Sequence, residues 1–282
     1  MNGITLGVMQ GRLLPKYQGR YQAHPLGYWQ KEFSLAAKMG LETIEFILDF
    51  NDVYLNPLMY SEGIDEILVL SEETGIKVKT VCADYFMEAP LHDHRRESAN
   101  ESRKVLKILI KNCTKLGVTD IIIPCVDKSS LDDELKKGRF SENIFSSIEL
   151  AEQSNINLSL ETDLAPEFLI EILDRLESHK VTVNYDTGNS ASLGYDPKEE
   201  LLAYGNRISD IHIKDRVYRG GSVVLGMGDT KFPAFFEAVV QINYQGPFIM
   251  QAYRDDEGIQ VFKKQLDWIK PRIDACKIAN VS

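Results

Sequence analysis

The sequence predicts an α/β protein folded as one closed (β/α)8 TIM barrel, a single domain over residues 1–282. Three observations favour this fold class. Eight short runs of apolar and β-branched residues recur along the chain, segments with helical periodicity lie between them, and no linker or composition break divides them. Barrels of this kind often form one domain of about 250 residues, so we prefer the barrel to a doubly wound sheet.

The eight runs are predicted strands, because each is short and rich in residues that favour extended backbone. They lie at residues 4–9, 43–47, 77–82, 120–124, 157–161, 181–186, 209–214 and 247–251. Successive strands begin 24 to 43 residues apart. This spacing is typical of a strand followed by a helix and its loops.

Helix start and stop signals fill the intervals between these strands. The helix-ending glycines are Gly40, Gly75 and Gly117. The first-turn prolines are Pro166, Pro197 and Pro233. Asp196 precedes one of these prolines and has an acidic residue three positions later, which is typical of a helix N-cap.

Composition and charge exclude several classes of function. The chain has 32 basic and 42 acidic residues, a net charge of −10 and a pI near 5.1, which argues against nucleic acid and anionic membrane as partners. No signal peptide or membrane span is present, so we expect a cytoplasmic protein. Four cysteines without a C-x-x-C pair predict reduced, buried thiols. The sequence leaves open whether the chain forms a homo-oligomer.

Polar side chains end four successive predicted strands, where active sites of such barrels lie. Alternation along each strand directs Glu161, Asp186, His212 and Gln251 into the barrel mouth. Two carboxylates, an imidazole and an amide oxygen suit one divalent metal ion, such as Mn²⁺, Mg²⁺ or Zn²⁺. Taken singly, each strand-end carboxylate could equally be bound to a backbone amide or an arginine.

Two further charged groups point inward on predicted strands. Lys214 shares the face of His212 and is a candidate to polarise a carbonyl or donate a proton. An ion pair between Lys214 and Asp186 or Asp210 is an equally good interpretation. Glu45, in the middle of the second strand, is better explained as a hydrogen-bonded structural carboxylate than as a catalyst.

Candidate substrate contacts lie in the loops that follow the strands. Arg216 and Arg219 follow the seventh strand and Arg254 follows the eighth, a place where barrels often hold phosphate. A solvated basic loop is the alternative for these arginines. Asp84 follows the third strand and is a candidate to line a sugar pocket.

Four segments of the chain carry a family resemblance. They are Leu158-Ser-Leu-Glu161-Thr, Asn184-Tyr-Asp186-Thr-Gly-Asn189, Ile211-His212-Ile-Lys214-Asp215 and Gly226-Met-Gly228-Asp229. Their order and spacing resemble the xylose isomerase-like TIM barrels, in particular the sugar-phosphate isomerase/epimerase branch. That branch includes ketose 3-epimerases, pentulose 5-phosphate 3-epimerases, hydroxypyruvate isomerase and inosose dehydratase.

The resemblance implies a divalent-metal-dependent isomerase or epimerase of a small sugar or sugar phosphate, acting through an enediolate. It implies metal ligands at Glu161, Asp186 and His212, with Gln251 where the family has a second glutamate, and a substrate contact at Asn189. Glu161 is then the base. Because an amide cannot accept a proton at neutral pH, Gln251 leads us to expect a one-base isomerisation rather than a two-base epimerisation.

The sequence also allows other functions as alternatives. A dehydratase of the inosose type needs one base to begin its reaction, and a carbohydrate-binding or regulatory barrel with a degenerate metal site needs none. A three-zinc nuclease of this fold would need more histidines at strand ends than His212. The Gly226-x-Gly228 pair lacks the third glycine and the strand-to-helix setting of a dinucleotide-binding loop.

Overall fold

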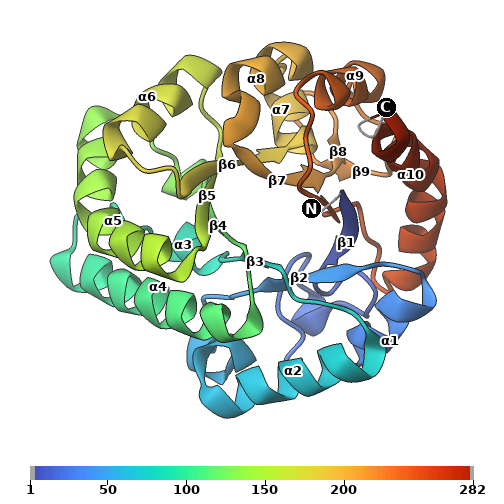
Figure 1. The fold of residues 1–282 in the computed structure, drawn as a ribbon, viewed down its shortest axis with the longest axis horizontal. Helices are drawn as coiled ribbons and strands as arrows, with labels where there is room; N and C mark the ends of the chain where they lie inside the picture. Colours follow the sequence, from blue (N-terminus) through green and yellow to red (C-terminus); the bar gives the residue numbers. More distant parts are fainter. Residues whose placement is uncertain (1–3, 280–282) are drawn as a thin grey trace. The chain divides into compact units, whose positions relative to one another are not determined.

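A computed structural model describes residues 4–279 of the chain. Eight parallel strands form a closed barrel in the order β1-β10-β7-β6-β5-β4-β3-β2, and helices follow the strands along the chain (Figure 1). The predicted (β/α)8 fold is therefore confirmed. Within the described range, no helix is both long and apolar enough to span a bilayer.

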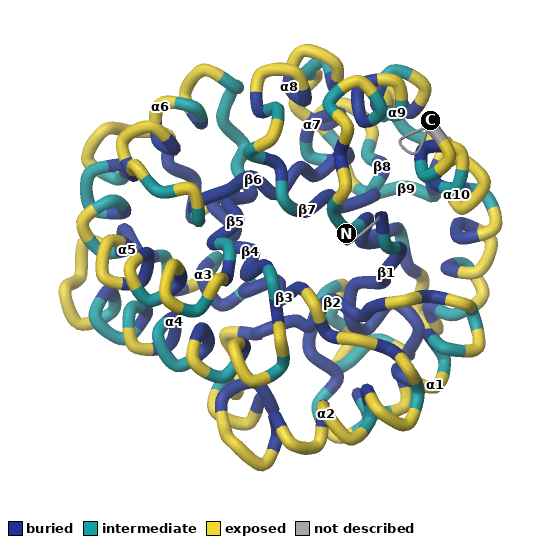
Figure 2. The backbone as a smooth tube through the Cα atoms, viewed as in Figure 1, coloured by how far each residue is buried: buried dark blue, intermediate teal, exposed yellow. Residues whose placement is uncertain are grey.

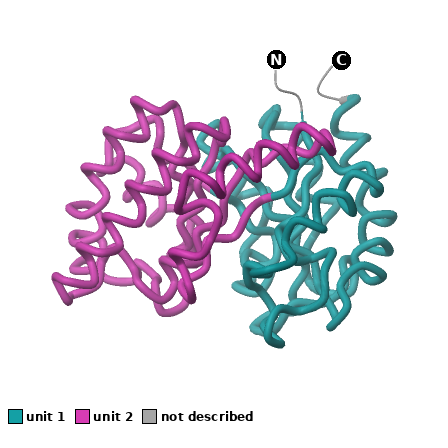
Figure 3. Tube along the Cα trace, turned by 90° about the horizontal axis from the view of Figure 1, so that it is seen from below, with its two compact units in different colours: residues 1–44, 184–282 teal, residues 45–183 magenta. Residues whose placement is uncertain are grey.

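Two compact units are distinguished by their internal contacts (Figure 3). Unit 1 comprises residues 1–44 and 184–282, and unit 2 comprises residues 45–183. Strands β2 (Thr43–Ile47) and β6 (Val181–Asp186) run across the two boundaries between these units.

Unit 1 contains both ends of the described chain. Its strands are β1 (Thr5–Met9), β7 (Ile208–Ile213), β8 (Asp215–Arg216), β9 (Ser222–Val223) and β10 (Pro247–Met250). Its helices are α1 (Lys31–Lys38), α7 (Thr187–Leu193), α8 (Pro197–Tyr204), α9 (Phe232–Gln241) and α10 (Ile259–Ala279). Strand β10 lies between β1 and β7, and β8 and β9 form a small antiparallel hairpin.

Unit 2 carries the middle of the chain. Its strands besides β2 and β6 are β3 (Thr80–Cys82), β4 (Asp120–Cys125) and β5 (Asn157–Thr162). Its helices are α2 (Ser61–Thr74), α3 (Tyr85–Glu88), α4 (Arg96–Leu116), α5 (Glu134–Ser154) and α6 (Pro166–Leu176). Parallel pairing connects β2 to β3, β3 to β4, β4 to β5 and β5 to β6.

The strands are buried on both sides, whereas the helices expose their outer faces (Figure 2). This is the pattern of parallel strands covered by helices. Gly7 of β1 shows how closely the elements pack. A Cβ at this position would lie 2.4 Å from Cγ2 of Thr43 and 2.7 Å from Cδ1 of Ile249, so only glycine fits there.

Most predicted element boundaries agree with the structure. Two predicted helix ends are confirmed, because Gly75 and Gly117 are left-handed C-caps. A predicted helix start is confirmed as well, because the Asp196 side chain accepts N–H groups of the first turn of α8. Strand β3 is an exception, because it begins at Thr80 and not at Lys77. Its neighbour β4 begins at Asp120, the pairing partner of Thr80, so the preceding residues have no strand beside them on that side.

Candidate active site

Asp186 ends β6 and caps the N-terminus of α7. Its Oδ1 accepts the N–H groups of Gly188 and Asn189, each at 2.8 Å. Burial raises the pKa of Asp186, but the positive charges of Lys214 and His212 and the Asn189 N–H together lower it further, so the net shift is downward. Asp186 therefore presents a buried carboxylate whose Oδ2 faces Lys214.

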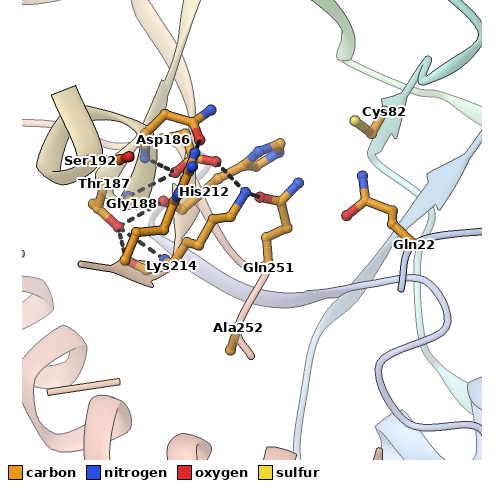
Figure 4. A network of polar contacts seen from close by, with 12 residues as sticks. Gln22, Cys82, Asp186, Thr187, Gly188, Ser192, His212, Lys214, Gln251 and Ala252 are labelled. Carbon is orange, nitrogen blue, oxygen red and sulfur yellow. Dashed lines mark hydrogen bonds and ion pairs between the residues drawn. The ribbon is translucent and has the colours of Figure 1, made fainter. Parts of the chain in front are cut away.

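Lys214 follows β7 and links two of the predicted site residues (Figure 4). Its Nζ lies 3.3 Å from Oδ2 of Asp186 and donates to Oε1 of Gln251 at 2.8 Å. Gly188 makes room for this side chain, because a Cβ at Gly188 would lie 2.7 Å from Cγ of Lys214. The Lys214 N–H also donates to Oγ1 of Thr187 at 2.9 Å. The ion pair with Asp186 that the sequence allowed is thus present.

His212 lies on β7 and is fully buried. It pairs in register with Ile249 of β10. Its Nε2 lies 3.6 Å from Oδ1 of Asp210, which also accepts a 2.7 Å hydrogen bond from Nδ2 of Asn184. Neighbouring strands of unit 1 therefore bring His212 to the same barrel face as two polar side chains.

Two predicted substrate-binding residues, Asn189 and Arg216, contact each other. The Arg216 guanidinium donates to Oδ1 of Asn189 at 2.9 Å through Nη1 and to the Gly220 carbonyl at 3.0 Å through Nε. Arg219 is exposed, has a left-handed backbone with φ of 52°, and lies over the Tyr218 ring at 5.1 Å. The β8–β9 hairpin thus presents basic groups beside the start of α7.

Arg254, a predicted substrate contact, makes hydrogen bonds to four backbone carbonyls. Its guanidinium donates to the backbone carbonyls of Gly11, Leu14, Asp255 and Asp256, at 2.7, 2.7, 3.1 and 3.4 Å. The side chain is 3 % exposed. These hydrogen bonds hold the loop after β1, and the substrate contact of Arg254 stays a prediction.

Glu32 of α1 holds the same loop through its N–H groups. Its carboxylate accepts from the N–H of Gly11 at 2.7 Å and of Leu13 at 3.0 Å. Burial raises the pKa of Glu32 to about 7, although these hydrogen bonds and the nearby arginines act in the opposite direction. The loop after β1 is therefore held by two buried side chains, Glu32 through its N–H groups and Arg254 through its carbonyl groups.

The remaining predicted residues, Glu161 and Asp84, lie in unit 2. Glu161 is near the end of β5, pairs in register with Pro124 of β4, and is 5 % exposed. Asp84 follows β3 and accepts a 3.2 Å hydrogen bond from the Sγ of Cys82. Burial raises the pKa of Cys82 well above its ordinary value, and all four cysteines are free and buried as predicted.

A family model described as xylose isomerase-like TIM barrel matches residues 33–272. This chain belongs to that family. The predicted family membership is thus confirmed, and the match covers most of both units.

Several curated proteins are similar to the chain over most of its length. One is a putative L-ribulose-5-phosphate 3-epimerase, SgbU, of Escherichia coli strain K12, 26 % identical over 262 residues, which are 87 % of this chain and 91 % of the relative. Another is the L-ribulose-5-phosphate 3-epimerase UlaE of Escherichia coli strain SMS-3-5 / SECEC, 24 % identical over 87 % of this chain and 90 % of the relative.

Solved structures of sugar epimerases have the same fold as this chain. D-allulose 3-epimerase from Methylomonas sp. superposes with a TM-score of 0.76 at 18 % identity, covering 96 % of this chain and 99 % of that one. The 3-keto-D-glucoside 4-epimerase YcjR from Escherichia coli gives a TM-score of 0.74 at 16 % identity, covering 95 % and 99 %. These structures show the fold, and the curated relatives confirm the predicted enzyme class, a sugar isomerase or epimerase.

Sequence reasoning did not single out Thr187 and Gly188, which position Lys214. Both stand inside a segment that the family resemblance quoted, so the signal was present. It also missed Asp215, a fully buried carboxylate that accepts the N–H groups of Gly226, Gly228 and Thr230. The glycine pair of this family motif therefore belongs to a loop organised around Asp215.

Proposed function

We propose that this protein is a divalent-metal-dependent epimerase of a ketose or ketose phosphate, and that Glu161 and Lys214 carry its proton transfers. Similarity to several sugar epimerases supports the epimerase over the isomerase that the sequence alone favoured. The observation that carries the proposal is the 2.8 Å hydrogen bond between Lys214 Nζ and Gln251 Oε1.

Epimerisation beside a carbonyl needs one group to remove a proton and another to return one to the opposite face. An amide at position 251 can do neither. The ammonium of Lys214 lies one hydrogen bond from that amide and carries protons that it can donate. Lys214 therefore supplies the second proton-transfer group, which the glutamine at position 251 cannot provide. With it, the site can carry out a two-base epimerisation.

The chemistry of the donor set fits a divalent cation. Glu161, Asp186 and His212 are buried and offer oxygen and nitrogen donors of the kind that bind Mn²⁺, Mg²⁺ or Zn²⁺. The metal is assigned to these three residues, because two carboxylates and an imidazole supply the charge and the donor atoms that such an ion needs. When bound, such an ion polarises the substrate carbonyl and lowers the cost of enolisation.

Each residue of the chain then has a defined task. Glu161 removes the proton from the carbon beside the ketose carbonyl, and Lys214 Nζ returns a proton to form the epimer. Gln251 and Asp186 hold the ammonium in place, and Gly188 leaves space for its aliphatic chain. Both proton-transfer groups exchange with solvent before the next turnover.

A phosphate on the substrate is best accommodated by Arg216 and Arg219. Arg216 is held by Asn189 and Gly220, and Arg219 is exposed beside it in the chain. Arginine binds phosphate in a bidentate manner through its planar guanidinium. L-Ribulose 5-phosphate and the uncharged D-allulose, the sugars named for similar proteins, are therefore suitable probes.

The test follows both probes in deuterated water with added Mn²⁺, using NMR to detect the epimer and deuterium at carbon 3. Glu161→Gln should lower epimerisation and exchange at least about 10²-fold, the typical contribution of a general base. Lys214→Met should lower epimerisation equally while leaving exchange without inversion. Lys263→Met, at an exposed ion pair of α10, is the matched control and should behave as wild type.

Epimerisation at the wild-type rate by Lys214→Met would remove Lys214 from the mechanism. Wild-type protein that neither exchanges nor epimerises either ketose would contradict the proposed function itself.

A further inference from the structure

Asp210 and His212 lie two residues apart on the same face of β7, and both are fully buried. Oδ1 of Asp210 accepts a 2.7 Å hydrogen bond from Nδ2 of Asn184 on β6. The same oxygen lies 3.6 Å from Nε2 of His212. One carboxylate oxygen of unit 1 therefore faces an amide from one strand and an imidazole from its own strand.

The position of Asp210 distinguishes the two ring nitrogens of His212. A neutral imidazole carries its proton on one nitrogen and keeps a lone pair on the other. An ionised carboxylate offers acceptors only, so it favours the proton on the nitrogen that faces it. Nε2 is that nitrogen, which leaves the lone pair of His212 at Nδ1.

We infer that Asp210 is a positioning residue, which keeps the proton of His212 on Nε2 and so makes Nδ1 the atom that binds the divalent cation. This inference rests on the metal centre of the proposed function, in which His212 supplies one donor. It adds a residue outside the donor set and names the donor atom. A carboxylate beside the second ring nitrogen of a metal-bound histidine fixes the ring and makes the other nitrogen more basic.

Two neighbours limit the other movements of this pair. The Asn184 hydrogen bond restrains the Asp210 carboxyl group and supplies a donor to a charge that is costly to bury alone. The backbone of His212 is held as well, because its carbonyl accepts a 3.2 Å hydrogen bond from Oγ1 of Thr187. Rotation of the ring and the place of its proton are therefore the features that Asp210 controls.

Asp210→Asn tests the inference with little change of shape. Asparagine has one side-chain oxygen for the two donors, Asn184 and His212, and its NH₂ group favours a lone pair on the ring nitrogen that faces it. Asp120→Asn is the matched control. Asp120 is also a buried strand carboxylate, and it accepts a 2.8 Å hydrogen bond from Nδ2 of Asn157 on the neighbouring strand β5.

Metal affinity is the first measurement, at about pH 8, where histidine is normally neutral. EPR detection of free Mn²⁺ gives the dissociation constant without turnover. Kd should rise about 10- to 100-fold in Asp210→Asn, the usual effect of losing the partner of a metal-bound histidine. Asp120→Asn should bind Mn²⁺ as the wild type does.

The place of the ring proton is the second measurement, made on the metal-free protein. Long-range ¹H–¹⁵N correlation spectra of histidine-labelled protein show which ring nitrogen is protonated, and His212→Gln identifies the signals of His212 among five histidines. The wild type and Asp120→Asn should carry the proton on Nε2. Asp210→Asn should move a share of it to Nδ1, a change that loss of a purely structural contact would not cause.

A proton on Nδ1 of wild-type His212 would overturn the inference, and this result needs no variant to fold. Wild-type Mn²⁺ affinity in Asp210→Asn would also overturn it, as would weaker binding with the ring proton unmoved. Wild-type protein that binds Mn²⁺ and carries the proton on Nε2, but epimerises neither ketose, would contradict the proposed function and support the inference. Wild-type protein that binds no Mn²⁺ would overturn both.

Discussion

Glu200 of α8 is a buried carboxylate that connects three elements next to the candidate active site. It is 4 % exposed, and its Oε2 accepts hydrogen bonds from Tyr185 of β6, at 2.9 Å, and from Ser190 of α7. Tyr185 directly precedes Asp186. Burial raises the pKa of Glu200 from 4.5 to about 7, against the lowering effect of both hydrogen bonds.

This shift gives the stability of the protein a defined pH dependence. A carboxyl group with a higher pKa in the folded protein than in the unfolded chain favours folding while it is protonated. Its contribution is complete below about pH 4.5 and is lost as the pH rises through about 7. The direction is opposite to that of a salt-bridged carboxylate such as Asp93, whose pKa is lowered by Arg95.

Glu200→Gln should therefore stabilise the protein at pH 8, because the amide cannot ionise and can still accept both hydrogen bonds. The free energy of unfolding should rise by on the order of 3 kcal/mol at pH 8, and by less than about 1 kcal/mol at pH 5. Urea denaturation from pH 5 to 8 measures this difference, with the exposed Glu199→Gln as control. A wild-type pH slope that persists in Glu200→Gln would contradict the assignment.

At the residue scale, the sequence could predict which side chains end the strands but not which partners they choose. The alternation of inward and outward side chains along a strand predicts that Asp186 and His212 point inward. The same rule said nothing of Lys214 binding Gln251, because that contact depends on side-chain rotamers and on the space above Gly188.

At the element scale, the loop after β1 is held from two sides. Glu32 accepts two of its N–H groups, and Arg254 donates to two of its carbonyls. The loop carries Arg12, which in turn holds Gln22. A change in Glu32 or Arg254 should therefore shift the loop and the segment that Arg12 holds after β10, next to Gln251.

Arg254→Met should lower the free energy of unfolding by about 2 to 4 kcal/mol, because it leaves buried carbonyls without donors. It should lower kcat/KM by the same factor for L-ribulose 5-phosphate and for L-ribulose. Arg219→Ala, by contrast, should raise KM only for the phosphorylated sugar and leave the melting temperature unchanged. Urea denaturation and steady-state kinetics measure these effects.

A stable Arg254→Met protein whose KM rises for the phosphorylated sugar alone would instead support the predicted phosphate contact of Arg254. The partners of such a side chain are harder to predict than helix boundaries are. Helix punctuation at Gly75, Gly117 and Pro197 is local and could be read from the sequence. The direction of a side chain in the irregular segment after β10 is set by distant partners, such as Gly11 and Leu14.

At the scale of the whole molecule, the barrel could be predicted because its signal repeats along the chain. Because eight strands recur at regular spacing, the predicted fold does not depend on any one of them. The wrongly predicted start of β3 therefore leaves the fold prediction unchanged. The proposed metal ligands Glu161, Asp186 and His212 lie far apart in the sequence. Unfolding would separate them, so metal binding should favour the folded state.

Mn²⁺ should stabilise the protein, because a ligand that binds only the folded state adds RT ln(1 + [L]/Kd) to the free energy of unfolding. At a Mn²⁺ concentration of about 100 times Kd this term is about 2.7 kcal/mol, which corresponds to a rise in melting temperature of roughly 5 to 10 °C for a chain of this size. Glu161→Gln in unit 2 and His212→Gln in unit 1 should each abolish most of the rise. Glu142→Gln, at an exposed position of α5, should keep it and serves as the control. Thermal melts with Mn²⁺ and with EDTA make the comparison. Loss of the rise in both variants would support Glu161 and His212 as ligands, whereas a rise that survives either substitution would mean that the ion binds elsewhere.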